Sequence, residues 1–226
     1  MDIKIKIKNA VSNYNPFAIN HRNRMRKILV NRDFSFICPN CLGGMLLHDL
    51  GLPFLSPTVN LMIHQREFVK FVLNIDYYLS QKLCFYSDPY YVCPCAKVGE
   101  GHRTVTIHFT HYANQEEAEA CWKKRISRIS YDNLFVFAME KDGMTKEDIL
   151  KLGLLKVRGL VVFTAHDYPD IPYTCFISKY QNQGMVGNIL VRSYLNDKKE
   201  YESYFDFVKW FNEANGENYN CRPYCL

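Results

Sequence analysis

The chain has 226 residues, of which 48% are hydrophobic and 15% aromatic, enough to bury a core without disulfides or metal ions. No uncharged apolar run approaches the roughly 20 residues of a membrane-spanning helix. The beginning, MDIKIKIKNA, alternates charge with isoleucine where a signal peptide has its apolar segment. These features exclude a membrane-spanning chain and predict an ordinary soluble, cytoplasmic globular protein.

Nine cysteines are a high number, but the count is odd and no export signal is visible. Disulfide scaffolds are usually shorter chains from oxidising compartments. We therefore expect most of these cysteines to be reduced thiols that fill small spaces in the core.

The positive charge is concentrated at the beginning of the chain. Residues 1–32 contain eight of the 28 Lys and Arg residues and one of the 23 Asp and Glu residues, so this segment has a net charge of +7 and the remainder −2. We expect residues 1–21 to be a basic extension and residues 22–226 to be a single α/β domain. The cluster HRNRMRK predicts either a solvated helix face or peripheral contact with an anionic membrane. Nucleic acid is the less favoured partner, since no nucleic-acid motif accompanies the charge.

The first part of the chain predicts three helices and one strand. Residues 16–30 begin at a proline and form the first expected helix. Residues 33–38, DFSFIC, are a short buried strand. Residues 41–51 form a helix that Gly51 ends, and residues 64–81 form a longer helix with apolar side chains three and four apart.

The second part alternates strands and helices after an expected loop at residues 87–102. The expected strands are 104–111, 133–139, 159–165 and 174–178, and the expected helices are 115–130, 145–155 and 201–214. Asn114 and Thr145 are the expected N-caps, the latter with Asp148 three residues later. This alternation predicts an α/β fold, here a single three-layer domain with a mixed, mostly parallel sheet flanked by helices.

Polar side chains follow several of the expected strands. They are Asn40 and Cys41, His108 and His111, Glu140 and Asp142, and His166 and Asp167. In open parallel sheets, ligands bind beyond the carboxyl ends of the strands. If these strands are neighbours, the groups face one cleft.

The cysteines of CPNC, Cys38 and Cys41, have the spacing of a zinc knuckle. The second close pair, Cys93 and Cys95, follows about 50 residues later and has a single intervening residue. Structural zinc sites usually join two tight knuckles, so zinc is the less favoured interpretation.

A catalytic interpretation makes Cys41 a nucleophile at the start of a helix. Backbone N–H groups there lower a thiol pKa and, with Asn40, can stabilise an oxyanion. His108 or His111 would be the general base. The plainer alternatives are a small buried cysteine, a histidine that pairs with the threonines of its strand, and a strand-end histidine in solvent.

Five residues are expected to contact the substrate. They are Asn40, Gly43, Gly44, His166 and Asp167. The two glycines also suit close packing of a helix on a sheet, and the last two residues also suit a capped bend.

The stretch MEKDG suggests a different chemistry. Glu140 and Asp142 can hold a divalent cation that carries a diphosphate leaving group, as in many sugar-nucleotide transferases. The plainer alternative is a structural turn, because DG favours turns and Thr145 begins the next helix.

Many runs in the chain resemble those of a bacterial domain family of unknown function whose members are often labelled exopolysaccharide biosynthesis proteins. The runs extend over residues 22–212 and are NRDFSFI, NCLGG, LGLPFLSPTVNL, FVKFVLNIDYYLSQKL, IHFTHY, DNLFVF, KDG, VVFT and FDFVKWFN. The matching residues are Asn40, Cys41, Gly43, Gly44, His108, His111, Asp142 and Gly143. Cys38 and Pro39 depart from the family pattern, and Glu140 stands where the family has an aspartate.

The resemblance implies a transferase in exopolysaccharide or capsule biosynthesis, in the cytoplasm or at the inner face of the membrane. Acyl transfer through the Cys–His pair is the favoured reaction, with a glycan or an activated donor as substrate. A metal-dependent glycosyltransferase is the alternative, and only that reaction predicts a divalent cation as cofactor. A third alternative is a non-catalytic glycan-binding protein with tyrosines such as Tyr90, Tyr91, Tyr112 and Tyr168 lining a groove.

Overall fold

The structure of the protein is a computed structural model that describes residues 15–193 and 197–226. Most of the expected basic extension, residues 1–14, lies outside the described residues. The helices are α2 (Pro16–Ile28), α3 (Leu42–Leu50), α4 (Gln65–Leu73), α5 (Ile75–Ser80), α6 (Gln115–Ile126), α7 (Lys146–Leu152) and α8 (Phe207–Glu213). The strands are β1 (Ser35–Ile37), β2 (Cys84–Tyr86), β3 (Cys95–Val98), β4 (Val105–His108), β5 (Leu134–Met139), β6 (Gly159–Thr164) and β7 (Thr174–Phe176).

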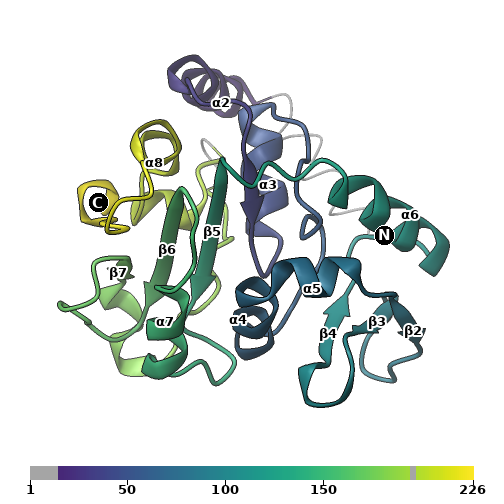
Figure 1. Cartoon of the computed structure of the whole chain (residues 1–226). Coiled ribbons are helices and arrows are strands. Elements are labelled where there is room, and N and C mark those ends of the chain that lie inside the picture. Colours follow the sequence, from purple (N-terminus) through teal and green to yellow (C-terminus); the bar gives the residue numbers. More distant parts are fainter. Residues whose placement is uncertain (1–14, 194–196) are drawn as a thin grey trace.

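The central sheet has the order β1-β5-β6-β7, and its neighbouring strands are parallel (Figure 1). Every residue of β5 and β6 is buried. Continuous apolar runs such as LFVFAM and GLVVFT are typical of parallel strands covered on both faces. The predicted α/β fold is therefore confirmed.

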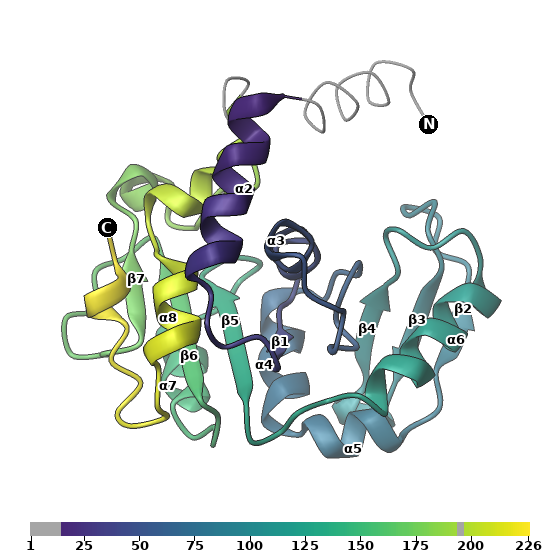
Figure 2. The same ribbon diagram turned by 90° about the horizontal axis from the view of Figure 1, so that it is seen from above.

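Helices lie on both faces of the central sheet (Figure 2), and each face buries its own cluster of apolar side chains. On one face Phe135 and Phe137 pack with α3, α8 and part of α2. On the other face Val136 and Ala138 pack with α4, α7 and a second, smaller sheet. Because successive side chains of a strand point to opposite faces, the single run of β5 supplies both clusters. The result is the expected three-layer arrangement.

The smaller sheet corrects two expectations. Its order is β2-β3-β4 with antiparallel neighbours, so the expected strand 104–111 belongs to this sheet and not to the parallel one. The expected loop 87–102 contains β3, whose residues pair with β2 and β4. Backbone pairing on both sides explains how a short segment next to Pro94 becomes a strand despite its weak sequence pattern.

Two expected helices differ most from the sequence pattern, and the helices expected at residues 115–130 and 145–155 also end early, at Ile126 and Leu152. The helix expected at residues 64–81 is divided into α4 and α5, because Asn74 has φ −131° and ψ 40° and its side-chain amide donates to the carbonyl of Lys70. The closing helix, expected at residues 201–214, begins only at Phe207, and the Asp206 carboxylate caps it by accepting from the Lys209 N–H.

The helix ends follow the expected local chemistry. Gly51 ends α3 in the left-handed region with φ 67°, where a side chain would be strained. Asn114 accepts from the Glu117 N–H at 2.8 Å, and Thr145 forms a capping box with Asp148. Within the described residues, none of the helices is long and apolar enough to cross a membrane.

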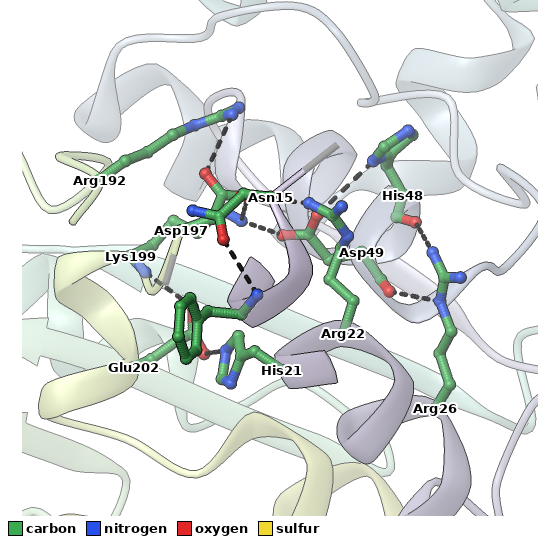
Figure 3. A network of polar contacts seen from close by, with 11 residues as sticks. Asn15, His21, Arg22, Arg26, His48, Asp49, Arg192, Asp197, Lys199 and Glu202 are labelled. Atoms are coloured by element: carbon green, nitrogen blue, oxygen red, sulfur yellow. Dashed lines mark hydrogen bonds and ion pairs between the residues drawn. The ribbon is translucent and has the colours of Figure 1, made fainter. Parts of the chain in front are cut away.

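Helix α2 is anchored to the rest of the molecule by a network of buried charges (Figure 3). Lys199 is 1% exposed, and its Nζ contacts carboxylate oxygens of Asp49 in α3 and Asp197. Arg22 of α2 donates to Asp197 at 3.0 Å. The expected domain boundary between residues 21 and 22 thus falls inside a helix that packs on α3.

Candidate active site

Cys41 lies where β1 turns into α3. Asn40 makes this turn, because its Oδ1 accepts from the backbone N–H of Leu42 at 3.0 Å. Cys41 is the residue that precedes the first turn of the nine-residue helix α3, as the sequence predicts. The thiol therefore lies beside the N-terminus of a helix at the carboxyl end of a parallel strand.

The two glycines after Cys41 permit close packing. A Cβ on Gly43 would lie 3.0 Å from Cβ of Cys38, and a Cβ on Gly44 would lie 2.6 Å from Oδ1 of Asn60. Both glycines thus have a steric reason to be present. Their predicted role in substrate binding stays a prediction.

His111 is the histidine that reaches Cys41. Its Nε2 lies 3.1 Å from the Cys41 Sγ, and the Thr110 hydroxyl lies 3.8 Å from the same sulfur. Both residues are in the turn that follows β4, and the Thr110 hydroxyl donates to the carbonyl of Asn60. The pair predicted from sequence, a cysteine at a helix start with a histidine from a distant strand end, is brought together in space.

Burial raises the pKa of the Cys41 thiol above its ordinary value, and hydrogen bonds from Thr110 and from the Cys41 backbone only partly offset this effect. The expectation of a lowered pKa at the helix N-terminus is therefore wrong. The desolvation of a half-buried thiolate outweighs the stabilisation by nearby dipoles. Cys41 rests as a neutral thiol, and a base must remove its proton during any attack.

His108 has a different set of neighbours. It is buried in β4, and its Nδ1 lies 3.4 Å from Sγ of Cys95. The Tyr91 ring lies against its imidazole, with 4.0 Å between the ring centroids. Burial, followed by the charge of His64, lowers the pKa of His108. Of the two candidate bases, His111 and not His108 contacts the Cys41 thiol.

The Glu140 carboxylate is enclosed by protein donors. Its Oε2 accepts from the N–H groups of Ala165 and His166 at 2.8 and 3.1 Å. Its Oε1 accepts from the Tyr168 hydroxyl at 2.7 Å and lies 2.8 Å from Nδ1 of His166. The buried carboxylate thus orients the imidazole of His166, while Asp167 is exposed in the same loop.

Asp142 has other partners. It adopts a left-handed conformation with φ 52°, and its Oδ2 accepts from the Gln65 N–H at 3.4 Å and lies 3.6 Å from Nδ1 of His64. Across the described residues, no three His, Cys, Asp or Glu side chains are arranged to hold a metal ion. The geometry therefore gives no support to a cation shared by Glu140 and Asp142.

The ends of the strands are joined by further contacts. Nδ2 of Asn40 donates to the Met139 sulfur at 3.2 Å, and Oε1 of Gln65 accepts from the Met139 N–H at 3.1 Å. The Ile63 N–H donates to the carbonyl of Pro39 at 2.9 Å, next to a bridge that pairs Met62 with β4. This connecting segment brings β4, and with it His111, to the end of β1.

Gln65 is a contact residue of this region that the sequence does not indicate, and Cys95, which the sequence offers only as part of the second cysteine pair, contacts His108. A glutamine at a helix start has no distinctive signal, and Cys95 lies in a stretch whose pattern predicts a loop. Cys38 and Cys95 also have separate partners, since the Cys38 thiol donates to Oδ1 of Asn40. The less favoured zinc interpretation gains no support from this arrangement.

One family model and one known protein each match most of the chain. The model of the family described as "Domain of unknown function (DUF1919)" matches residues 11–212. A protein of Haemophilus influenzae, described as an uncharacterized protein, is 40% identical over 210 residues, which cover 92% of this chain and 98% of that relative. The chain therefore belongs to the DUF1919 domain family.

Proposed function

We propose that the protein is a transferase that carries an acyl group as a thioester on Cys41. The observation that supports this proposal is the 3.1 Å contact between the Cys41 Sγ and the His111 Nε2 beside the start of α3. A thiol and an imidazole within hydrogen-bond distance are the minimum set for nucleophilic catalysis with a general base. Glu140 and His166 lack a comparable nucleophile.

The proposed reaction has two steps. In the first, His111 takes the thiol proton as Sγ attacks the acyl carbon of the donor, and the leaving group departs with that proton. In the second, His111 takes the proton of an acceptor hydroxyl as its oxygen attacks the thioester, and Cys41 departs and is reprotonated. The neutral resting thiol is consistent with proton removal during the attack rather than before it.

Asn40 is the proposed stabiliser of the oxyanion in both steps. Its Oδ1 is held by the Leu42 N–H, which fixes the orientation of the carboxamide. Its Nδ2 contacts only a thioether in the described structure, the Met139 sulfur at 3.2 Å, and sulfur is a weak acceptor. A developing oxyanion is a stronger acceptor, so we propose that Nδ2 also donates to it.

The proposed acceptor is a hydroxyl of a surface glycan. This part of the proposal rests on the resemblance to family members labelled exopolysaccharide biosynthesis proteins, and it places the reaction in exopolysaccharide or capsule formation. The cytoplasm, or the inner face of the membrane, is the compartment that we propose for it.

Acetylation with p-nitrophenyl acetate tests the proposal. We expect peptide mass spectrometry to find the acetyl group on Cys41 ahead of the exposed Cys84, and Cys41→Ala to lose this labelling. Added oligosaccharide should then discharge the thioester faster than water does. Acetylation of Cys84 with an unmodified Cys41 would contradict the mechanism and favour a protein that binds glycans without transforming them.

A further inference from the structure

A cationic groove lies on the outer side of α4 and α7, which pack side by side (Figure 1). Its volume is about 580 Å³, within the range of small-molecule sites. Four Lys and Arg side chains line it, namely Arg66, Lys70, Arg103 and Lys151, together with His102. The groove is outside the Cys41–His111 site and has no role in the two steps above.

The groove is positively charged, although the part of the chain that forms it has a negative net charge. Among the described residues that line it, Asp148 is the one acidic residue, so the Lys, Arg and Asp residues of the lining have a net charge of +3. The whole of residues 33–226 has a net charge of −2. Asp148 is already engaged by Thr145 and lies 3.5 Å from Arg66. The concentration of positive charge predicts an anionic ligand.

Two of the cations form ion pairs at the surface, Arg66 with Asp148 at 3.5 Å and Lys151 with Glu147 at 2.9 Å, and exposed pairs of this kind contribute little to stability. Arg66 and Lys70 are four residues apart on α4, a spacing at which like charges repel each other and destabilise a helix. Both side chains are on the surface, so neither is needed to neutralise a buried carboxylate. A bound polyanion would convert this repulsion into attraction.

The floor of the groove is apolar. Val69 and Leu73 lie four residues apart on α4, on the same side of the helix, and both line the groove. An apolar floor with a cationic rim suits a ligand that combines a flat ring system with phosphates. A nucleoside diphosphate has this composition, whereas inorganic phosphate would leave the floor uncovered.

The groove extends away from the candidate active site. Helix α4 begins at Gln65, which binds the Met139 N–H at the end of β5. Arg66 is the next residue, and Lys70 lies about 6 Å beyond Arg66 along the helix at a rise of about 1.5 Å per residue. We propose that the groove binds the nucleoside diphosphate part of the activated acyl donor. Its identification as a donor site rests on the proposed function.

Calorimetric titration with ADP tests the site. We expect the wild-type protein to bind ADP and the Lys70→Glu/Lys151→Glu variant to bind it at least about tenfold more weakly, because charge-assisted hydrogen bonds to phosphate are lost. The matched control is Lys124→Glu, which reverses an exposed lysine on α6 away from the groove. It should leave the affinity unchanged, and adenosine should bind far more weakly than ADP.

Three results would overturn the inference: no binding of ADP to the wild-type protein, equal weakening by the control, or equal affinity for adenosine. The test is separate from that of the thioester. Cys41→Ala should bind ADP as the wild-type protein does, because Cys41 does not line the groove. Binding of ADP without acetylation of Cys41 would keep the groove and contradict the acyl-transfer mechanism.

Discussion

Cys41 is half-buried, and this burial raises the pKa of its thiol. The Cys41 Sγ also lies 3.1 Å from Nε2 of the His111 imidazole. A cysteine protected in this way reacts slowly with general alkylating agents at neutral pH. The residue is suited to react when a substrate is bound, since the base and the nucleophile are already in contact.

The pH dependence of Cys41 alkylation follows from this environment. The pKa is raised, so at a given pH below it the thiolate fraction is smaller in the folded protein than in the unfolded chain. We expect Cys41 alkylation by iodoacetamide, followed by peptide mass spectrometry, to rise at higher pH in the native protein than in urea. A native profile at lower pH than the unfolded one would show that dipoles outweigh desolvation.

Among the structural elements, α2 and α3 are joined through charges that are nearly inaccessible to water. Lys199 lies between Asp49 and Asp197, so its removal would leave the buried Asp49 carboxylate without its main partner, while Asp197 would keep Arg22 and Arg192. We expect Lys199→Met to lower the free energy of unfolding by about 3–5 kcal/mol in urea titrations.

The matched control for this prediction is Lys179→Met. Lys179 pairs with Glu200 at 2.6 Å, but its side chain is 55% exposed. Exposed pairs contribute about 0–1 kcal/mol, so this variant should be nearly as stable as the wild-type protein. Equal losses of unfolding free energy in the two variants would mean that the burial of an ion pair does not determine its contribution to stability.

The elements that the sequence predicts well are those with strong local signals. These signals depend only on neighbours within a few residues of the chain. They are the apolar runs of β5 and β6, the N-caps of α6 and α7, and the glycine that ends α3. The elements that it misses depend on distant partners. β3 exists through its pairing with β2 and β4, and the side chain of Asn74 interrupts a helix whose apolar spacing continues unbroken.

At the scale of the whole molecule, the two apolar clusters share one sheet. The two tryptophans report on them separately, because Trp122 belongs to the cluster with α4 and Trp210 to the cluster with α8. Since β5 and β6 supply side chains to both, we expect the clusters to unfold together.

Single-tryptophan variants test this coupling. In Trp122→Phe and in Trp210→Phe, the remaining tryptophan's fluorescence and the far-UV circular dichroism should give the same urea midpoint. A fluorescence transition that is separated from the circular dichroism transition in either variant would mean that the two layers unfold independently.

The candidate active site shows which of its contacts depend on the arrangement of the whole molecule and not on local sequence. CLGG places Cys41 at a helix start, and this prediction is confirmed. The choice between His108 and His111 depends on how the segment before α4 passes between β1 and β4, through the contacts of Ile63 and Met62. Local sequence patterns do not contain this path, so the sequence alone does not distinguish His108 from His111 as the base.

The rate of Cys41 acetylation by p-nitrophenyl acetate at neutral pH, compared among the wild-type protein, His111→Ala and His108→Asn, tests the central claim most directly. General-base catalysis contributes about 10²–10⁴-fold, so His111→Ala should lower the rate by that order. His108→Asn, if folded by circular dichroism, should react like the wild-type protein because His108 contacts Cys95. An unchanged rate in His111→Ala, or a loss confined to His108→Asn, would contradict the proposed role of the Cys41–His111 pair.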